Sequence, residues 1–411
     1  MCLDVDTITA LLNIPTHHIA RIAEYQEDRA CFVLEPREGV VPICSGCGKG
    51  HAGLEHSKET VVVEDVGLCG RRVFLQVVKR KLRCPEDGRI RVEKLAWVRE
   101  RFTTRFAEQI TRLTAITTNQ EAGWYLGLDD EKVYRIDRKM LEEAARHKLD
   151  PVPVPTHMSV DEVAWQKWHR YVTNVVDIDK RTVIWNEDGR GKEVLDRFYK
   201  ALGKENSKNI AAVASDGARG YLSSTKENAP QALIVLDHFH VKKYLNDAVD
   251  TVRKQELHTA REQNNKELSA LLHCNKRFIL MQNTITNKKR DLLEQLAQLN
   301  QRVYQALLLK EQFLSIYVSG DRATAWANLK AWIVAALRCG LPSFEELGRK
   351  FFRKRHYVLN YFICKITTSV SEGINNKIKR LTRMAYGYRD VKYFLLKIHQ
   401  HCGLLNPRLS I

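Results

Sequence analysis

The sequence predicts an α+β protein built from several domains. Its 411 residues are about three times the commonest domain size, so each domain can bury a core of its own. The hydrophobic fraction of 44% and the aromatic fraction of 8% are those of globular proteins. Along the chain, the apolar pattern changes from the alternation typical of strands to the 3.6-residue spacing of helices. A mainly disordered chain is thereby excluded.

Residues 1–100 are expected to form a small β module. Alternating apolar and polar residues near positions 18–22 and 30–34 are typical of strands, as are the longer runs at 60–66 and 71–83.

A zinc site is predicted within this β module. Residues 44–48 form a C-x-x-C-G turn, in which glycines allow two thiolates to face one centre, as in half of a zinc knuckle. Tetrahedral zinc needs four ligands, and the sequence at 84–87 supplies one cysteine instead of a second pair. We expect Zn²⁺ to be bound by Cys44, Cys47, Cys84 and Cys69, with His51 or His56 as alternatives to Cys69. A metal-free β module with spare thiols is the other interpretation.

Residues 101–150 are predicted to be a helix-turn-helix domain. The run at 119–127 indicates a short helix closed by glycine, and Asp129 or Asp130 caps a second helix over 132–145. In such motifs the second helix enters a DNA groove. The cations that it would present to DNA are Lys132, Arg135, Arg138 and Lys139. A plain helical hairpin is the alternative.

The proline-rich run at 151–155 is a stiff linker and marks the start of a new domain. Three strand patterns joined by short polar turns follow it, and helices then alternate with apolar strands. Strands are expected at 158–165, 171–179, 182–186, 210–214 and 232–236, and helices at 191–202 and 217–228. The order βββαβαβ over residues 151–240 predicts a ribonuclease H-like α/β core.

The rest of the chain is expected to complete this core after an interruption. Residues 241–360 show helical periodicity alone, which indicates an all-helical insertion. Residues 361–411 are expected to supply the last helix of the core and a basic tail.

The charge distribution indicates a polyanionic partner. The formal charge is +17. Residues 349–397 hold 13 Lys or Arg and two acids, and residues 71–112 hold 13 and five. Nucleic acid is the first hypothesis and an anionic membrane the second. We expect no membrane span, because no run of about 18 uncharged apolar residues exists. The scattered cysteines and the absence of a basic N-terminal leader predict a cytoplasmic protein, nucleoid-associated when bound to DNA.

Three acidic residues are candidates for catalysis. Asp161 lies within the first predicted core strand, Asp216 ends the fourth, and Glu372 is the one acid of a long basic helix. Taken singly, each acid has a simpler interpretation. Asp161 could be an ordinary acid at a strand end, Asp216 a turn or helix cap, and Glu372 a member of an ordinary ion pair. Three converging carboxylates would repel one another unless divalent cations were bound. Two Mg²⁺ or Mn²⁺ ions at such a site support phosphoryl transfer on DNA.

The sequence resembles the DDE transposases of the ISL3 group of bacterial insertion sequences. The resemblance rests on blocks at 159–162, 215–217 and 237–241, and on a helix at 372–379 followed by Ala385-Tyr386-Gly387-Tyr388-Arg389. It extends over nearly the whole chain. It implies a zinc-binding N-terminal domain, a helix-turn-helix and a ribonuclease H-like core split by a helical insertion.

The resemblance also implies site residues and partners. Asp161, Asp216 and Glu372 correspond to the metal ligands of the family, and His240 would lie beside the scissile strand. The expected DNA-binding residues of the basic segment are Asn375, Asn376, Lys377, Lys379, Arg380, Arg383 and Arg389. Such an enzyme would bind the terminal repeats of its element as a homodimer, cleave them and join them to target DNA. The alternatives are a non-catalytic DNA-binding regulator and a structure-specific nuclease.

Overall fold

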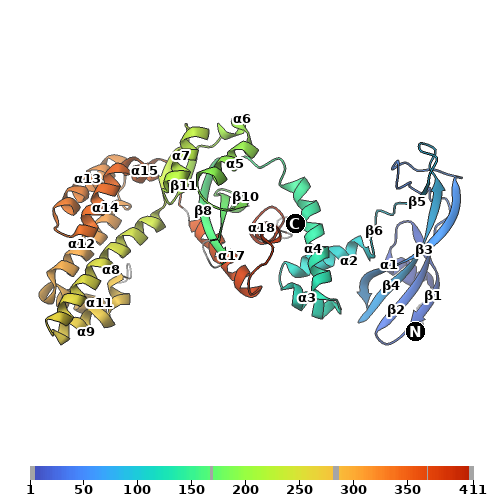
Figure 1. The fold of residues 1–411 in the computed structure, drawn as a ribbon, viewed down its shortest axis with the longest axis horizontal. Helices are drawn as coiled ribbons and strands as arrows, with labels where there is room; N and C mark the ends of the chain where they lie inside the picture. The colour runs from blue at the N-terminus through green and yellow to red at the C-terminus, as the bar shows by residue number, and fades with distance from the viewer. Residues whose placement is uncertain (1–4, 167–169, 281–286, 368, 407–411) are drawn as a thin grey trace. The chain divides into compact units, whose positions relative to one another are not determined.

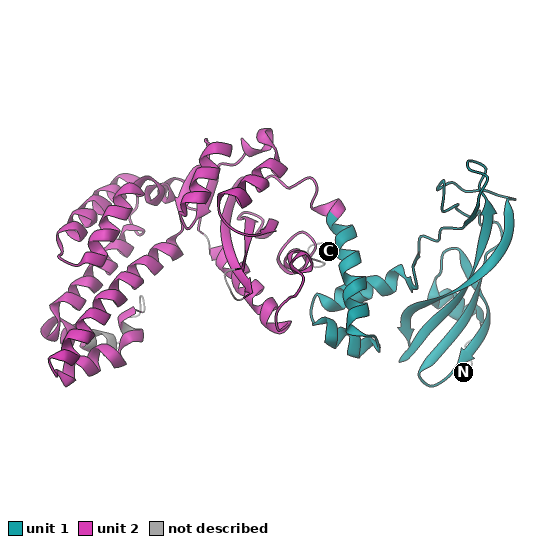
Figure 2. Cartoon of the chain, viewed as in Figure 1, with its two compact units in different colours: residues 1–145, 410–411 teal, residues 146–409 magenta. Residues whose placement is uncertain are grey.

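The computed structural model describes residues 5–166, 170–280, 287–367 and 369–406 (Figure 1). The chain divides into two compact units, residues 1–145 with 410–411 and residues 146–409 (Figure 2).

The first unit is built on a sheet with the strand order β1-β2-β4-β3-β7-β6, in which β5 pairs with β4. Its elements are α1 (Val5–Leu12), β1 (His17–Tyr25), β2 (Arg29–Pro36), β3 (Glu55–Leu68), β4 (Arg71–Arg83), β5 (Ile90–Val92), β6 (Val98–Arg99) and β7 (Phe102–Thr103). The four strands expected in this module are present. Alternate residues of β4, among them Val73, Leu75 and Val77, are fully buried and pack with Ile8 and Leu12 of α1.

Three helices complete the first unit: α2 (Thr104–Thr114), α3 (Asn119–Leu126) and α4 (Asp130–Lys148). Thr118 and Glu121 form a capping box at the start of α3, and Gly127 ends that helix with a φ of 66°. A side chain at Gly123 would lie 2.7 Å from the carbonyl oxygen of Leu128, so only glycine allows the turn to approach α3 this closely. The second helix begins at Asp130, earlier than the predicted residue 132.

The second unit contains a five-stranded sheet with the order β10-β9-β8-β11-β12. The strands are β8 (His157–Gln166), β9 (Arg170–Asp177), β10 (Thr182–Asp188), β11 (Ala212–Ser215) and β12 (Leu233–Leu236). The first three pair antiparallel, and β11 runs parallel to both β8 and β12. All five strands were expected from the sequence, within two residues at each end.

Helices cover both faces of this sheet. The helices are α5 (Lys192–Leu202), α6 (Lys204–Ser207), α7 (Arg219–Asn228), α17 (Ser369–Met384) and α18 (Val391–Cys402). Met158 and Val160 of β8 pack in a core with α5, while Val163 and Trp165 pack with α17 and α18. Because successive residues of a strand face opposite sides, Asp161 lies on the face covered by α17.

In the described residues between the strands and the final helices, all regular elements are helices. These helices are α8 (His238–Glu262), α9 (Lys266–Cys274), α10 (Lys276–Leu280), α11 (Asn287–Leu299), α12 (Gln301–Ile316), α13 (Arg322–Arg338), α14 (Pro342–Arg353), α15 (Arg355–Leu359) and α16 (Tyr361–Cys364). They share one core, in which the rings of Phe313, Trp332 and Phe351 contact one another. No helix in the described part of the chain is long and apolar enough to cross a membrane.

Candidate active site and zinc centre

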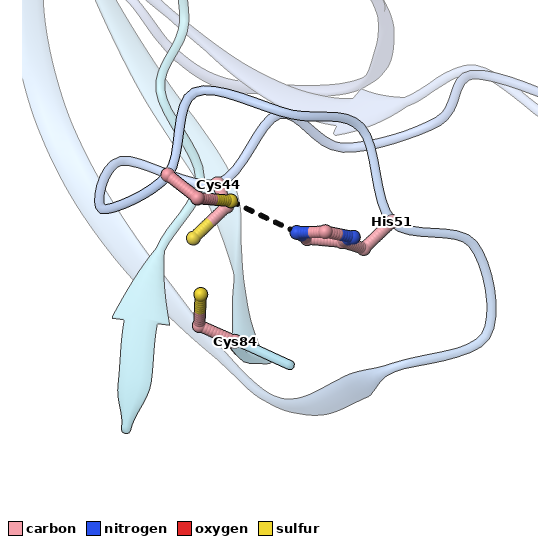
Figure 3. Close-up of side chains that lie close together, drawn as sticks. Cys44, His51 and Cys84 are labelled. Carbon is pink, nitrogen blue, oxygen red and sulfur yellow. Dashed lines mark hydrogen bonds between the residues drawn. The ribbon is translucent and has the colours of Figure 1, made fainter. Parts of the chain in front are cut away.

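Three cysteines and one histidine of the first unit form a compact cluster. One ligand atom each from Cys44, Cys47, His51 and Cys84 lies within 4.8 Å of all the others. Figure 3 shows the side chains of Cys44, His51 and Cys84 directed toward a common centre. The sulfur of Cys47 lies 3.0 Å from Nε2 of His51. Three sulfurs and one imidazole nitrogen are the donor set of a closed, structural zinc site.

Two similar turns hold the cysteines. In the first, the N–H of Gly48 donates to the carbonyl oxygen of Cys44 at 3.0 Å, and in the second, Gly88 donates to Cys84 at 2.8 Å. Both glycines have positive φ angles, 73° and 66°. The first turn has a second cysteine, Cys47, at its fourth position, whereas the second turn has Asp87 there. The second turn thus supplies one sulfur only, and the fourth member of the cluster is His51.

The sulfur of Cys44 is in an environment that favours the thiolate. A hydrogen bond from the backbone of Cys47 is the main cause that lowers the pKa of Cys44. The N–H of Gly46 also approaches this sulfur, at 3.4 Å. Zinc binds cysteine as the thiolate, so these donors prepare the site for a metal ion.

The structure corrects the expected fourth ligand. Cys69 is exposed in the turn between β3 and β4, at the opposite end of β4 from Cys84. A strand of 13 residues spans about 40 Å, so Cys69 cannot share an ion with Cys84. His56 lies in the exposed part of β3 beside Ser57. Of the three candidates that the sequence offered, His51 is the one in the cluster.

Two acidic residues directly follow adjacent parallel strands of the second unit, and a third, Asp161, lies within the neighbouring strand β8. Asp216 directly follows β11 and Asp237 directly follows β12, and these strands are paired in register to their last residues. In the pair of β8 and β11, Ser159 lies opposite Ala214, which brings Asp161 level with Asp216. The expected position of Asp216 at a strand end is therefore observed. Such edges of α/β sheets are where ligands bind.

These carboxylates are close enough to influence one another. Burial raises the pKa of Asp161, and the charges of Asp237 and Asp216 raise it further, while His240 opposes them. Burial also raises the pKa of Glu162, whose carboxylate accepts a hydrogen bond from the hydroxyl of Tyr221 at 2.7 Å. A divalent cation would relieve this accumulation of negative charge, so the donor set fits a hard metal ion.

Asp237 and His240 lie together in the first turn of α8. Asp237 is buried and caps this helix, because its Oδ1 accepts from the N–H of Phe239 at 2.9 Å. Nε2 of His240 lies 3.7 Å from Oδ2 of Asp237. From the sequence, Asp237 was noted as part of the block at 237–241 but was not chosen as one of the three metal ligands. The signal that could have found it is its place directly after an apolar strand, the same place that Asp216 has.

Helix α17 contacts β8 beside Asp161. Nδ2 of Asn375 donates to Oδ2 of Asp161 at 2.5 Å, and Ser371 hydrogen-bonds to Ser159. Glu372 is exposed, and no Lys or Arg of the described chain lies within 4.0 Å of its carboxylate. On a helix, Glu372 lies on the same flank as Asn375. The ordinary ion pair that could have explained Glu372 is therefore not observed in the described residues.

The basic residues predicted to bind DNA are in different environments. In α4, Lys132 pairs with Glu64 at 3.5 Å and lies over the ring of Phe102. Arg138 pairs with Glu142 within the helix, and Lys139 with Glu100. Arg135 is exposed. The exposed candidates of the basic segment are Asn376, Lys377, Lys379, Arg380, Arg383 and Arg389, whereas Asn375 is buried against Asp161.

Two family models match this chain. Residues 158–398 match the family model of the ISL3-type DDE transposases, which is described as a transposase. Residues 41–87 match the zinc-finger of transposases IS204, IS1001, IS1096 and IS1165, and this match includes all four residues of the cluster.

Two relatives match over most of their length. The chain is 30% identical to the transposase for insertion sequence element IS1001 of Bordetella parapertussis, over 91% of this chain and 93% of that protein. It is 25% identical to the transposase for insertion sequence element IS1557 of Mycobacterium tuberculosis, over 94% of this chain and 93% of that protein. The chain therefore belongs to the ISL3 family of DDE transposases.

Proposed function

We propose that this transposase cleaves DNA at the terminal repeats of an insertion sequence and joins the ends to target DNA at a site formed by Asp161, Asp216 and Glu372. The observation that carries the proposal is the level arrangement of Asp161 and Asp216 on adjacent strands. Burial, and to a smaller extent the charges of Asp237 and Asp216, raise the pKa of Asp161, which fits a site for Mg²⁺ or Mn²⁺.

The strand order supports a ribonuclease H-like core. Three antiparallel strands followed by two parallel ones, in the spatial order β10-β9-β8-β11-β12, give the third-second-first-fourth-fifth arrangement of that fold. We assign residues 151–240 and 361–411 to this core and residues 241–360 to the helical insertion. In the first unit, we assign residues 1–100 to the zinc module and 101–150 to a helix-turn-helix domain.

Each site residue has a distinct task in this proposal. Two divalent ions, when bound, activate a water molecule or a 3′-hydroxyl and stabilise the leaving oxygen of the phosphodiester. Asp161, Asp216 and Glu372 would hold these ions. Asn375 orients the carboxylate of Asp161 through its hydrogen bond. His240, which lies beside Asp237, would contact the scissile strand.

Recognition of DNA is assigned to exposed cations. Arg135 of α4 is the member of the predicted recognition set that has the most freedom to contact DNA, because Lys132, Arg138 and Lys139 are paired with acids. The exposed residues of the basic segment would contact phosphates of the terminal repeat or of target DNA. We further propose a homodimer, because two ends must be held together, and a cytoplasmic protein that binds the nucleoid.

One experiment separates this proposal from its alternatives. Purified protein is incubated with a labelled terminal-repeat duplex, a target plasmid and Mg²⁺, and the products are mapped. A transposase gives cleaved ends and ends joined to the plasmid. A nuclease cuts but does not join precleaved ends, and a regulator binds without cutting. Either of these two outcomes would contradict the proposal.

A further inference from the structure

Two lysines of the helical insertion approach the loop that carries Asp216. Lys350 lies in the last turn of α14, and Lys354 is the residue that caps the end of this helix. Nζ of Lys354 donates to the carbonyl oxygen of Gly217, the residue after Asp216, at 2.5 Å. Nζ of Lys350 lies 3.0 Å from the centroid of the Tyr244 ring, and the hydroxyl of Tyr244 donates to the backbone oxygen of Asp216 at 3.3 Å. Both ammonium groups are thus linked to the backbone at this strand end.

Neither lysine forms an ion pair with a carboxylate of the described residues. Both side chains are half-buried, and in the described chain no carboxylate oxygen lies within 4.0 Å of either Nζ. Burial lowers the pKa of Lys350 to about 8, and burial also lowers the pKa of Lys354. The negative charge of Asp216 opposes this effect on the pKa of Lys354, and the positive charges of Arg219 and Arg353 add to it. Partly desolvated cations in this setting gain stability when an anion binds.

We propose that Lys350 and Lys354 bind a backbone phosphate of the DNA strand that enters the site beside Asp216. This inference rests on the proposed function, which brings a phosphodiester to that edge of the sheet. A phosphate can accept hydrogen bonds from two ammonium groups at once, and a phosphate next to the scissile one would be fixed relative to Asp216. The helical insertion then forms one wall of the active site and helps to position the strand.

A purely structural interpretation is the main competitor. In that case, Lys354 only ties α14 to the loop at Gly217, and Lys350 only packs on Tyr244. The two interpretations differ in one measurable way. A phosphate contact depends on the charge of one particular phosphate of the DNA, whereas a structural tether does not.

The test is a scan of terminal-repeat duplexes that each carry a single neutral methylphosphonate near the cleavage position. Affinity and single-turnover cleavage are measured for wild type, Lys350→Gln and Lys354→Gln. The matched control is Lys330→Gln, which removes an exposed lysine on α13 of the same insertion. Unfolding midpoints of the variants verify that they fold.

We expect one or two methylphosphonate positions to weaken wild-type binding or cleavage by about tenfold, as the loss of one charged hydrogen bond does. The same positions should have little effect in Lys350→Gln or Lys354→Gln. Each variant should also reduce the slope of log affinity against log salt by at most about 0.9, the value for one phosphate. Lys330→Gln should keep the wild-type scan profile.

An unchanged scan profile in both variants, with wild type cutting normally, would overturn the lysine site and leave the proposed function intact. A wild-type protein that binds the duplex but never cuts would instead contradict the proposed function. In that case the affinities measured in the methylphosphonate scan would still test the lysine site. A wild-type protein that does not bind terminal-repeat DNA would contradict both.

Discussion

Asn375 donates a hydrogen bond to the carboxylate of Asp161 although 214 residues separate the two in the chain. The bond fixes the position of α17 along β8, and the contact between Ser371 and Ser159 does so one helical turn away. Glu372 lies between these two anchors in sequence. Its distance from the other acids is therefore set by two specific contacts with one strand.

Replacing either strand acid should abolish catalysis without abolishing binding. Asp161→Asn and Asp216→Asn each remove a metal-ligand charge but no positive surface, so terminal-repeat DNA should bind as tightly as before. Cleavage in Mg²⁺ should fall by several orders of magnitude in single-turnover assays. Retained cleavage by either purified variant would refute the assignment.

Glu372→Gln should fold and bind DNA normally but lose metal-dependent cleavage by several orders of magnitude. If Glu372 had only a structural role at this exposed position, replacing it would lower the free energy of unfolding by at most about 1 kcal/mol and would leave activity unchanged. Glu311→Gln, at an exposed position of α12, is the matched control. If Glu372→Gln cleaves within about threefold of wild type, which is less than 1 kcal/mol in the barrier, Glu162 and Asp237 become the candidates for the third carboxylate.

Asn375→Ala should reduce the cleavage rate by about 10- to 100-fold, because a hydrogen bond to a charged group contributes about 1.5–3 kcal/mol. DNA affinity should be unchanged, since the amide is buried and directed at Asp161. The neighbouring exposed amide provides the comparison, because Asn376→Ala leaves Asp161 untouched. A DNA-binding defect in Asn375→Ala with normal cleavage of bound DNA would instead make this side chain a DNA contact.

The zinc cluster contains His51 and not Cys69, two candidate ligands between which the sequence did not decide. His51→Ala should lower the zinc content of purified protein and the thermal stability of the N-terminal module, because a structural site with three ligands binds zinc weakly. His51→Cys should retain the metal. Cys69→Ala should change neither quantity, since Cys69 lies at the far end of the hairpin. A full complement of zinc in His51→Ala would contradict the cluster.

Acid should destabilise the second unit through His399. Burial lowers the pKa of His399 to about 4, from an ordinary value of 6.5. Between these values, the unfolded chain binds a proton that the folded chain does not, so stability falls as the pH decreases. The loss is about 1.4 kcal/mol per pH unit and ends near pH 4. The free energy of unfolding of His399→Gln should therefore change less between pH 7 and pH 5 than that of the wild type. His356→Gln, at an exposed position, is the control and should behave like the wild type. Equal pH dependence in all three would contradict this.

The sequence predicted the strands of the second unit well because their apolar runs are short and are bounded by polar turns. It also placed Asp216 at a strand end. The sequence could not predict that Asp237 lies beside these acids, because the parallel register of β11 and β12 depends on tertiary pairing. The role of Asn375 was equally hidden, since its partner is remote in the chain.

In the first unit, the limits of prediction were in the long-range contacts. His51 and His56 are both close to the first pair of cysteines in sequence, and only the path of the chain decides which one reaches them. The predicted recognition helix has the expected sequence pattern, but Lys132 and Lys139 pair with Glu64 and Glu100 from outside that helix. Local charge patterns do not reveal such partners.

The position of α17 late in the chain also affects the order in which a ribosome delivers the residues of the proposed active site. Asp216 and Glu372 are 156 residues apart, which corresponds to roughly 8 to 30 s of synthesis at about 5–20 residues per second. During that interval the nascent protein already carries its zinc module and the strands of its core. It lacks the helix that contacts Asp161, so an interrupted translation product would carry the zinc module without the complete set of proposed site residues.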